Sequence, residues 1–434
     1  MKRTLIAASV ALLSSTAMAD DHQQPNIIYV IGDGMGFEYI SAYRYAMSDL
    51  ETKELAETQF DHYLTGAALT YPEDDTWVTD SAASATALAT GEKSYNGAIG
   101  MDNDKTSLKT VMEYAKQSGY ATGSVSTSQI NHATPASFFS HHPSRYEYNE
   151  IADLMGQQIV DGNASFDVIL GGGQQYFIRA DKNWAELIEQ QGMRVIQDMQ
   201  MLDQVEQAPV MGLFAQKGLP HAIDEGKESL AKMTSSALRL LDNEDKPFAL
   251  MIEGSQIDWC GHANDIACAV HEMDSLNKAL EVVNEYIENN PNTLFVMTAD
   301  HSTGGLTIGR DGEYAWYSDR VMKIEHSIAY MKEKLLAMDS DQWASFVADA
   351  VNAELTQEYT DELAMAAEQH GEDREDALHK ALAYITADIT GTGWTTSGHT
   401  GVDVPVYATG PNSDQFRGYM NNTELGQRLI EIVK

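Results

Sequence analysis

Short apolar runs alternate with helical stretches along this chain. The runs that favour strands are residues 26–31, 121–126, 166–170, 247–252 and 293–298, with a sixth candidate at 403–408. Runs of this kind with helical segments between them are typical of parallel strands joined by crossover helices. We therefore expect an α/β fold in which a mostly parallel central sheet is flanked by helices on both faces.

The pattern changes between residues 310 and 392. Segments such as "RVMKIEHSIAYMKEKLLAM" and "DELAMAAEQHGEDREDALHKALAYI" are amphipathic at helical spacing and rich in Ala, Glu and Lys. The stretch is too long for one crossover helix. We interpret it as a helical insertion, or cap, within a single domain that spans residues 20–434.

The first nineteen residues have the features of an export signal. Lys2 and Arg3 precede an apolar stretch at 4–13, and "AMA" at 17–19 offers a small-residue cleavage site. This stretch is too short to span a bilayer, and no later segment is long and apolar enough. We expect a mature protein that begins near Asp20, is periplasmic or secreted, and has no membrane anchor.

The chain is strongly acidic, with a formal net charge of −37. Such a charge argues against a nucleic-acid partner and against nonspecific attraction of anionic substrates. An anion-binding site would need a local concentration of positive charge, such as bound metal.

The chain has two cysteines, Cys260 and Cys268, too few for a disulfide framework. On one continuous helix they would lie about 12 Å apart, too far to bridge, whereas a loop between them would allow a disulfide in an oxidising compartment. The sequence leaves both alternatives open.

Acidic and histidine residues follow four of the five main runs. "GDGMG" follows the first run, "TSQINHATP" the second, "EGSQIDWCGH" the fourth and "ADHSTGG" the fifth, whereas "GGG" at 171–173 after the third indicates a turn. Because ligands of open parallel sheets bind beyond the carboxyl ends of the strands, we expect these motifs to converge on one site.

The side chains in these motifs are typical of metal ligands. Asp258 and His262 share one face if a helix begins there, and His399 lies in the glycine-flanked "TSGHTG". Imidazole with carboxylate suits zinc, and a set of oxygens alone suits magnesium. The candidate ligands are Asp33, Glu253, Asp258, His262, Asp300, His301 and His399. They exceed the needs of one tetrahedral ion and indicate at least two.

Ser81 is a candidate nucleophile. Small helix-forming residues follow it in "VTDSAASATALATG", which puts Asp80 and Ser81 at a helix N-terminus. Serine is a favoured helix cap, so the motif alone is equally compatible with capping and with an anion site. Two metal ions with a serine favour in-line displacement at phosphorus.

Six motifs in order resemble those of alkaline phosphatases. They are "GDGMG", "TDSAASATALATG", "NHATP" followed by Arg145, "EGSQIDWCGH", "TADHSTGG" and "SGHTG". The resemblance is to bacterial members, marine or cold-adapted ones among them, and extends from Asn26 to "FRGYMNNTELG" apart from the helical insertion. It implies a homodimer that hydrolyses phosphate monoesters to an alcohol and inorganic phosphate at alkaline pH, through a covalent phosphoserine, with two zinc ions and one magnesium.

The resemblance also implies a role for each matched residue. Asp258, His262 and His399 would hold the first zinc, and Asp33, Asp300 and His301 the second, with Ser81 as nucleophile. Asp33 would also reach a magnesium completed by Thr134 and Glu253.

Four further positions concern the phosphate and the third ion. Arg145, oriented by Asp80, would clamp two phosphate oxygens as a bidentate fork. His132 stands where some bacterial relatives have an aspartate, and Trp259 where others have lysine or histidine. Both would lie behind the ligands of the third ion, where zinc is an alternative to magnesium.

The remaining histidines of this region and the rival functions carry less weight. We expect His141 and His142 to be solvated loop residues. "NIIYVIGDGMG" also begins like a dinucleotide-binding unit, but its last glycine comes one position early. The chain lacks the G-x-S-x-G of serine esterases and the C/S-x-P-x-R of sulfatases around Ser81. A phosphodiesterase, a mutase and a binding protein without turnover stay open as alternatives.

Overall fold

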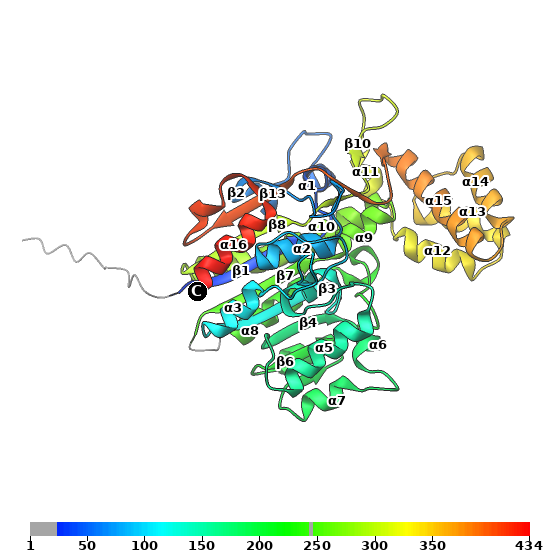
Figure 1. Ribbon diagram of the computed structural model, residues 1–434. Helices are drawn as coiled ribbons and strands as arrows, with labels where there is room; N and C mark the ends of the chain where they lie inside the picture. The colour runs from blue at the N-terminus through cyan, green and yellow to red at the C-terminus, as the bar shows by residue number, and fades with distance from the viewer. Residues whose placement is uncertain (1–23, 243–245) are drawn as a thin grey trace, which may run out of the picture.

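The computed structural model describes residues 24–242 and 246–434. The expected export signal lies outside these residues. Figure 1 shows a central twisted sheet with helices packed on its two faces and a group of helices, α12 to α15, to one side of it. No helix of the described residues is long and apolar enough to cross a membrane.

The main sheet has ten strands in the order β14-β2-β13-β8-β1-β7-β3-β4-β6-β5. Their bounds are β1 (Asn26–Gly32), β2 (Leu64–Leu69), β3 (Ala121–Gln129), β4 (Val168–Gly172), β5 (Arg194–Ile196), β6 (Val210–Leu213), β7 (Phe248–Gly254), β8 (Thr293–Ala299), β13 (Val404–Thr409) and β14 (Gly418–Asn421). Within this sheet β13 runs antiparallel to its neighbours β8 and β2, and the other recorded pairs are parallel. The predicted α/β fold with a mostly parallel sheet is confirmed.

The six predicted strands are all present because they form the buried centre of the sheet. Every residue of β3, β7 and β8 is buried, which accounts for their continuous apolar or small-residue runs. The strands of the main sheet that the pattern did not predict, β2, β5, β6 and β14, lie toward its two edges, and all of them except β2 have four residues or fewer.

The "GGG" motif is one place where the prediction was wrong. Gly171 and Gly172 belong to β4, and only Gly173, with φ at 114°, makes the turn. A Cβ at Gly172 would come within 1.7 Å of the Lys217 carbonyl oxygen. Gly172 therefore allows the loop after β6 to approach the end of β4 closely.

Helices cover both faces of the sheet (Figure 1). One layer contains α1 (Phe37–Met47), α8 (Ser229–Leu241) and α10 (Ile266–Asn289), which pack on one another. The other contains α2 (Ser81–Thr90), α3 (Val111–Gln117), α4 (Ala133–Phe139) and α16 (Asn422–Val433). All residues of α2 are buried between α4 and α16, and its small side chains make that packing close.

Residues 310–392 contain five α-helices and one short 3-10 helix, Ser340–Gln342. The α-helices are α11 (Ser318–Val321), α12 (Ile328–Leu336), α13 (Trp343–Ala350), α14 (Gln357–Ala367) and α15 (Gly371–Thr390). Their buried side chains include Trp343, Leu363 and Ile385. α15 packs against α12 and α14, so these helices form a layer with apolar residues of its own.

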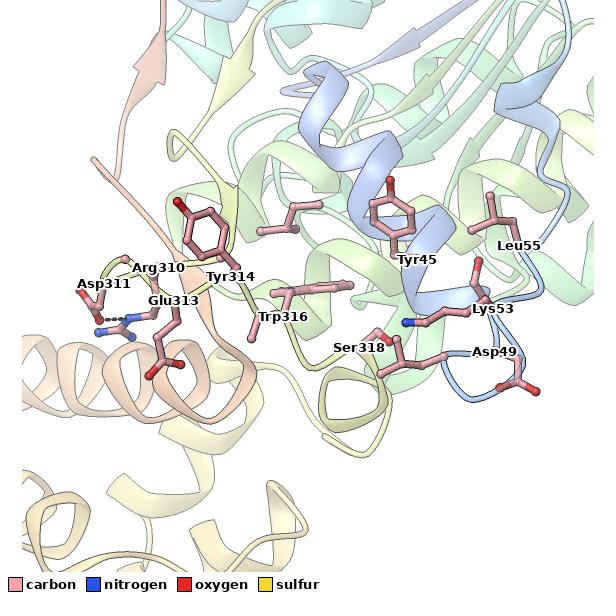
Figure 2. Close-up of a pocket in the computed structure, with 16 residues that line it drawn as sticks. Tyr45, Asp49, Lys53, Leu55, Arg310, Asp311, Glu313, Tyr314, Trp316 and Ser318 are labelled. Carbon is pink, nitrogen blue, oxygen red and sulfur yellow. Dashed lines mark hydrogen bonds and ion pairs between the residues drawn. The ribbon is translucent and has the colours of Figure 1, made fainter.

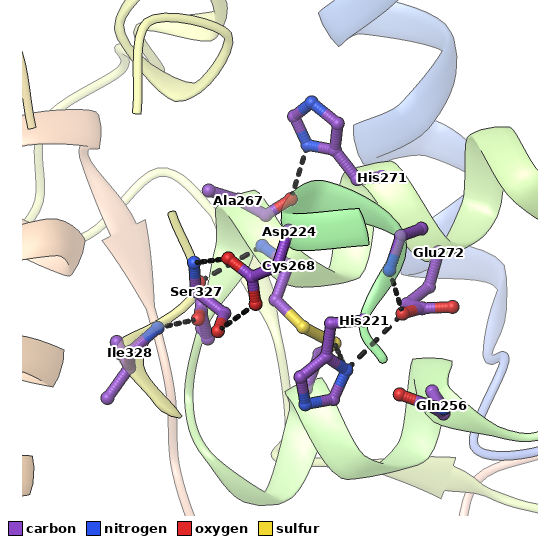
Figure 3. Close-up of a disulfide and its surroundings, with 12 residues drawn as sticks. His221, Asp224, Gln256, Ala267, Cys268, His271, Glu272, Ser327 and Ile328 are labelled. Carbon is purple, nitrogen blue, oxygen red and sulfur yellow. Dashed lines mark hydrogen bonds and ion pairs between the residues drawn. A yellow bond between two sulfur atoms is a disulfide. The ribbon is translucent and has the colours of Figure 1, made fainter. Parts of the chain in front are cut away.

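Cys260 and Cys268 form a disulfide, with their Cα atoms 5.5 Å apart (Figure 3). The sequence left open whether one continuous helix or a loop separates the two cysteines. The structure shows a break in the helix. α9 (Gln256–His262) ends before residues 263–265, and Asn264 in this break has φ at 52°. The chain turns there into α10, and this brings the two sulfurs together.

Candidate metal centre and active site

The candidate ligands meet because three neighbouring strands end at the same edge of the sheet. β1, β7 and β8 are adjacent and parallel, with Gly32 in register with both Gly254 and Ala299. Asp33 follows β1 directly, Asp300 follows β8, and Asp258 lies on α9 just after β7. The convergence predicted from the strand ends is therefore observed.

His399 reaches the same edge for a different reason. It lies in β12 (His399–Thr400), which pairs with β9 (Ser302–Thr303) and precedes β13. Because β13 is antiparallel to β8, the start of β13 lies beside the end of β8. His399, which precedes β13, therefore lies near ligands such as Asp33 and Asp300, which follow their strands.

Asp258, His262 and His399 form one cluster. His262 Nε2 lies 3.3 Å from Asp258 Oδ2, and His399 Nε2 lies 3.5 Å from Asp258 Oδ1. The two Nε2 atoms are 3.1 Å apart. Three potential ligand atoms therefore face one small volume.

The other ring nitrogens of both histidines are held by the backbone. His262 Nδ1 lies 2.6 Å from the Ser397 carbonyl oxygen, and His399 Nδ1 lies 2.8 Å from that of Thr79. A ring that donates through Nδ1 to a carbonyl keeps Nε2 as an acceptor, which is the usual arrangement of a metal-binding histidine.

Asp33, Asp300 and His301 form a second, fully buried cluster. His301 Nε2 lies 3.4 Å from Asp33 Oδ1 and 3.1 Å from Asp300 Oδ2. Asp300 Oδ1 accepts hydrogen bonds from the N–H groups of Gly34 at 3.0 Å and of His301 at 2.9 Å. Asp258 adjoins this cluster as well as the first.

The charges of these groups are strongly coupled. Burial is the main cause that raises the pKa of Asp33 well above its usual range, and the nearby charges of Asp300 and Asp258 add to it. Burial would also raise the pKa of Asp258, but the hydrogen bond and charge of His262 outweigh it and hold that pKa well below its usual range. Burial lowers the pKa of His399 to about 4. A cation is the natural counter-charge for such a group of carboxylates.

Several buried oxygens here accept no hydrogen bond from any described residue. They are both carboxylate oxygens of Asp33, Asp300 Oδ2 and Glu253 Oε1. A buried, unpaired acceptor costs on the order of 1–3 kcal/mol, and more when it is charged. Carboxylates and imidazoles with free lone pairs fit zinc, and buried carboxylate oxygens fit magnesium.

Glu253 is also fully buried, and Thr134 lies beside it. Its Oε2 accepts hydrogen bonds from Ser255 Oγ at 2.6 Å and Ser128 Oγ at 3.3 Å. Burial raises the pKa of Glu253 to about 7. The Glu253 charge in turn contributes to the raised pKa of Asp33, so these two carboxylates belong to one site.

His132 and Trp259 contact each other edge to face, with ring centroids 5.8 Å apart. Burial lowers the pKa of His132 to about 3, so its imidazole is neutral. The ring of Tyr148 stacks on His132. These rings pack together beside α4 and α9, the helices that carry Thr134 and Asp258.

Ser81 is the first residue of α2 and lies against the second cluster. Its Oγ is 3.1 Å from His301 Nε2. Asp80 caps the helix, because its Oδ1 accepts the N–H of Ala83 at 2.9 Å. The serine therefore has its hydroxyl free of the capping role that the sequence offered as an alternative.

Arg145 and Asp80 are paired. Arg145 Nη1 donates to Asp80 Oδ2 at 3.0 Å, and both side chains are mostly buried. The Arg145 Nε donor has no partner among the described residues. The guanidinium thus lies beside the end of α2 that carries Ser81, and its Nε–H is available to bind a ligand.

The expectation for His141 and His142 was wrong. His142 is buried and contacts Glu150 at 3.0 Å, and His141 bridges the Gly100 carbonyl oxygen and Glu113. Both rings cross-link loops to helices, because a loop packed against the domain needs partners for its buried polar groups.

Some contributing residues carried no usable signal in the sequence. Thr303 donates to Asp258 Oδ1, and Asn96 accepts the Asp80 N–H at 2.7 Å. Thr303 lies in "ADHSTGG", two residues after His301, but the sequence alone assigns its hydroxyl no role. Asn96 lies in a loop 16 residues from Asp80, and only the folded structure reveals the contact.

Two other features contain none of the candidate ligands. His221, Cys260, Cys268 and Glu272 come close together, but the disulfide leaves no thiolate to bind a metal. A groove of about 840 Å³ lies between the segment after α1 and the loop before α11, with Tyr45, Leu55 and Trp316 among its lining residues (Figure 2). None of the candidate ligands is among the residues that line it.

The fold and site together define an α/β protein with clustered acidic and imidazole side chains beside a serine hydroxyl. Residues 24–434 match the family model for alkaline phosphatase. "Alkaline phosphatase 3" of Bacillus subtilis is 42% identical over 422 residues, covering 94% of this chain and 89% of that protein. The chain therefore belongs to the alkaline phosphatase family and is an enzyme.

Solved structures agree with this assignment. The cold-active alkaline phosphatase of a psychrophilic Shewanella sp. superposes with a TM-score of 0.87 at 43% identity, covering 94% of this chain and all of that one. The alkaline phosphatase of the Antarctic bacterium TAB5 has a TM-score of 0.70 at 26% identity and covers 95% of this chain and 98% of its own. A histidine-to-aspartate mutant of the TAB5 protein has Mg bound in the M3 site.

Proposed function

We propose that this enzyme hydrolyses phosphate monoesters through a covalent phosphoserine on Ser81, at alkaline pH, with two zinc ions and one magnesium. The observation that supports this most is the position of the Ser81 hydroxyl, 3.1 Å from His301 Nε2 in a buried cluster of potential metal ligands. Family membership supports the phosphatase reaction itself.

The donor sets support three ions. Asp258, His262 and His399 suit the first zinc, and Asp33, Asp300 and His301 the second, because each set mixes carboxylate with imidazole. Asp33, Thr134 and Glu253 offer oxygen alone and suit magnesium. The Mg in the M3 site of the TAB5 mutant is in keeping with magnesium as the third ion, with zinc as the alternative.

The chain's own residues would carry the transfer in two steps. When bound, zinc lowers the pKa of a coordinated hydroxyl or water and stabilises a leaving oxygen. The Ser81 oxygen attacks phosphorus, the P–O bond to the alcohol breaks, and a water later cleaves the phosphoserine to release phosphate. The N-terminus of α2 directs its free N–H groups toward the developing negative charge.

Hydrolysis of p-nitrophenyl phosphate tests this proposal directly. We expect turnover at alkaline pH with purified, metal-loaded enzyme, and much weaker turnover of bis(p-nitrophenyl) phosphate, because a second ester group would meet the Arg145 clamp. A preference for the diester would favour the phosphodiesterase alternative. Binding of phosphate with no turnover of either compound would favour a binding protein.

Arg145 provides a graded test of the phosphate clamp. Arg145→Lys keeps the charge but loses the fork that can hold two oxygens, so we expect kcat/KM to fall by about 10- to 100-fold, mainly through KM. Steady-state kinetics with p-nitrophenyl phosphate measures this.

Arg179→Lys is the matched control for Arg145. Arg179 is equally buried and also pairs with an aspartate, Asp153, at 2.7 Å, but it lies away from the site. We expect its kinetics to stay at the wild-type values. Equal losses in both variants would mean that Arg145 has only a structural role.

Three wider assignments belong to the same proposal. The enzyme is exported by cleavage of the first nineteen residues, it acts as a homodimer, and residues 310–392 are an insertion within one catalytic domain. Intact mass of the mature protein and its mass in solution test the first two.

A further inference from the structure

The helices of residues 310–392 are attached to the main domain next to a candidate metal ligand. The break between α9 and α10, residues 263–265, follows His262 directly and is here called the elbow. The Cys260–Cys268 disulfide spans it, and the start of α12, Ser327 and Ile328, lies beside it (Figure 3).

Asp265 joins α9, α10 and α12 at the elbow. Its Oδ1 accepts the N–H of Cys268 at 3.0 Å and caps α10, while its Oδ2 accepts the N–H of Ile328, the first residue of α12, at 2.6 Å. Its own N–H donates to the Cys260 carbonyl oxygen at 2.9 Å. Asp265 is 1% exposed, so these bonds replace the water that a carboxylate would otherwise hold.

Two more contacts fix the helices of residues 310–392 to the same part of the main domain. Asp224 accepts the N–H of Ser327 at 3.1 Å and its hydroxyl at 2.7 Å. His379, on α15, makes a hydrogen bond with the backbone of Ala263. Both α12 and α15 are therefore anchored at or beside the elbow.

The elbow in turn supports the ligand cluster. The Asn264 amide donates to the carbonyl oxygens of Gly261 at 3.0 Å and Thr396 at 2.9 Å. The next residue, Ser397, holds His262 Nδ1 through its carbonyl oxygen. The end of α9 and the segment that leads to His399 are thus tied together through Asn264.

We infer that Asp265 is a positioning residue for the ion held by Asp258, His262 and His399. Through this carboxylate the helices of residues 310–392 hold the elbow, and the elbow aims His262 Nε2. This inference rests on the proposed zinc site. The His262 side chain is 41% exposed against 4% for Asp258, so packing alone restrains it less. Loss of the outer partners of a metal ligand typically weakens metal binding by about 10- to 100-fold.

Asp265→Ser separates this role from simple helix capping. Serine is a good N-cap and can still accept the Cys268 N–H, but its shorter side chain cannot also reach Ile328. We expect the variant to hold its weakest zinc about tenfold less tightly than the wild type. Titration of the loaded enzyme with chelators of graded zinc affinity measures this without reference to turnover.

Thr356→Ala is the matched control. Thr356 caps α14 in the same group of helices, and no contact between it and the elbow is recorded in the described chain. It should lower thermal stability by a comparable amount and leave zinc affinity unchanged. Asp265→Asn keeps the length of the side chain but has a single oxygen acceptor, so it too should lose the bond to the Ile328 N–H and lower zinc affinity.

The outcomes distinguish this inference from the proposed function. Wild-type zinc affinity in Asp265→Ser, or an equal loss in Thr356→Ala, overturns the positioning role and leaves the catalytic proposal intact. A wild-type protein that binds no zinc overturns both.

Discussion

Ser81→Ala is expected to lower the turnover of p-nitrophenyl phosphate by roughly 10⁴- to 10⁶-fold, the range for loss of a catalytic nucleophile. The hydroxyl lies at the start of α2 with no capping bond of its own, because Asp80 caps the helix. Its removal therefore deletes the atom that would accept the phosphoryl group and leaves the helix start and the ligand cluster in place. Rapid-quench kinetics and mass spectrometry of acid-quenched enzyme should detect a phosphorylated chain in the wild type only.

Ser137→Ala is a suitable control for this substitution. Ser137 is also fully buried, lies on the neighbouring helix α4, and donates to the Ala133 carbonyl oxygen at 2.8 Å. We expect near wild-type turnover and normal phosphoenzyme. If Ser81→Ala kept substantial activity while its metal content was unchanged, a direct attack by water on the substrate would replace the phosphoserine route.

Removal of metal by EDTA is the second change with a large expected effect. It should abolish turnover and lower the melting temperature, because the metal-free centre leaves the carboxylates of Asp33, Asp258, Asp300 and Glu253 close together with only nearby imidazoles to balance their charge. Zinc with magnesium should restore both properties. Differential scanning calorimetry and activity, measured on the same samples, test this, and chelator-insensitive activity would contradict it.

The metal-free protein should also lose stability as pH rises. Burial raises the pKa values of Asp33 and Glu253, that of Glu253 to about 7, above their values in the unfolded chain. The folded state then holds protons that the unfolded state has released, so the stability from these groups is present at about pH 4 and is lost as pH approaches 7. We expect a lower melting temperature at pH 8 than at pH 5.5 without metal. With metal the difference should shrink or reverse, because binding requires deprotonated ligands.

The centre of the sheet was predictable because its strands are buried on both sides. An apolar run such as β8 is stable when it is buried in the middle of a sheet. The polar residues that follow it then lie beyond the carboxyl end of the strand. The edge strands were not predictable in this way. β5 has only three residues, and most residues of β2 are partly exposed. Neither strand therefore has a distinctive pattern of hydrophobic and polar residues.

The candidate site was also predictable only in part. Asp33, Asp258, Asp300 and His301 were predictable as neighbours because they follow strands that the pattern identified. His399 was a candidate only through its glycine-flanked loop, since its position depends on the antiparallel direction of β13, which no local pattern encodes. The elbow contacts of Asp265 and Asn264 join segments more than 60 and 130 residues apart, and a single sequence does not reveal such pairs. The contacts that His141 and His142 make with distant segments were missed for the same reason.

Anomalous X-ray diffraction at the zinc edge, on crystals of enzyme purified without chelator, tests the central claim most directly. We expect one zinc peak among Asp258, His262 and His399 and another among Asp33, Asp300 and His301. Each should lie about 2.0–2.2 Å from its nitrogen and oxygen ligands, with Ser81 Oγ beside the second. Absence of peaks there from an active enzyme, or zinc bound only elsewhere, would contradict it.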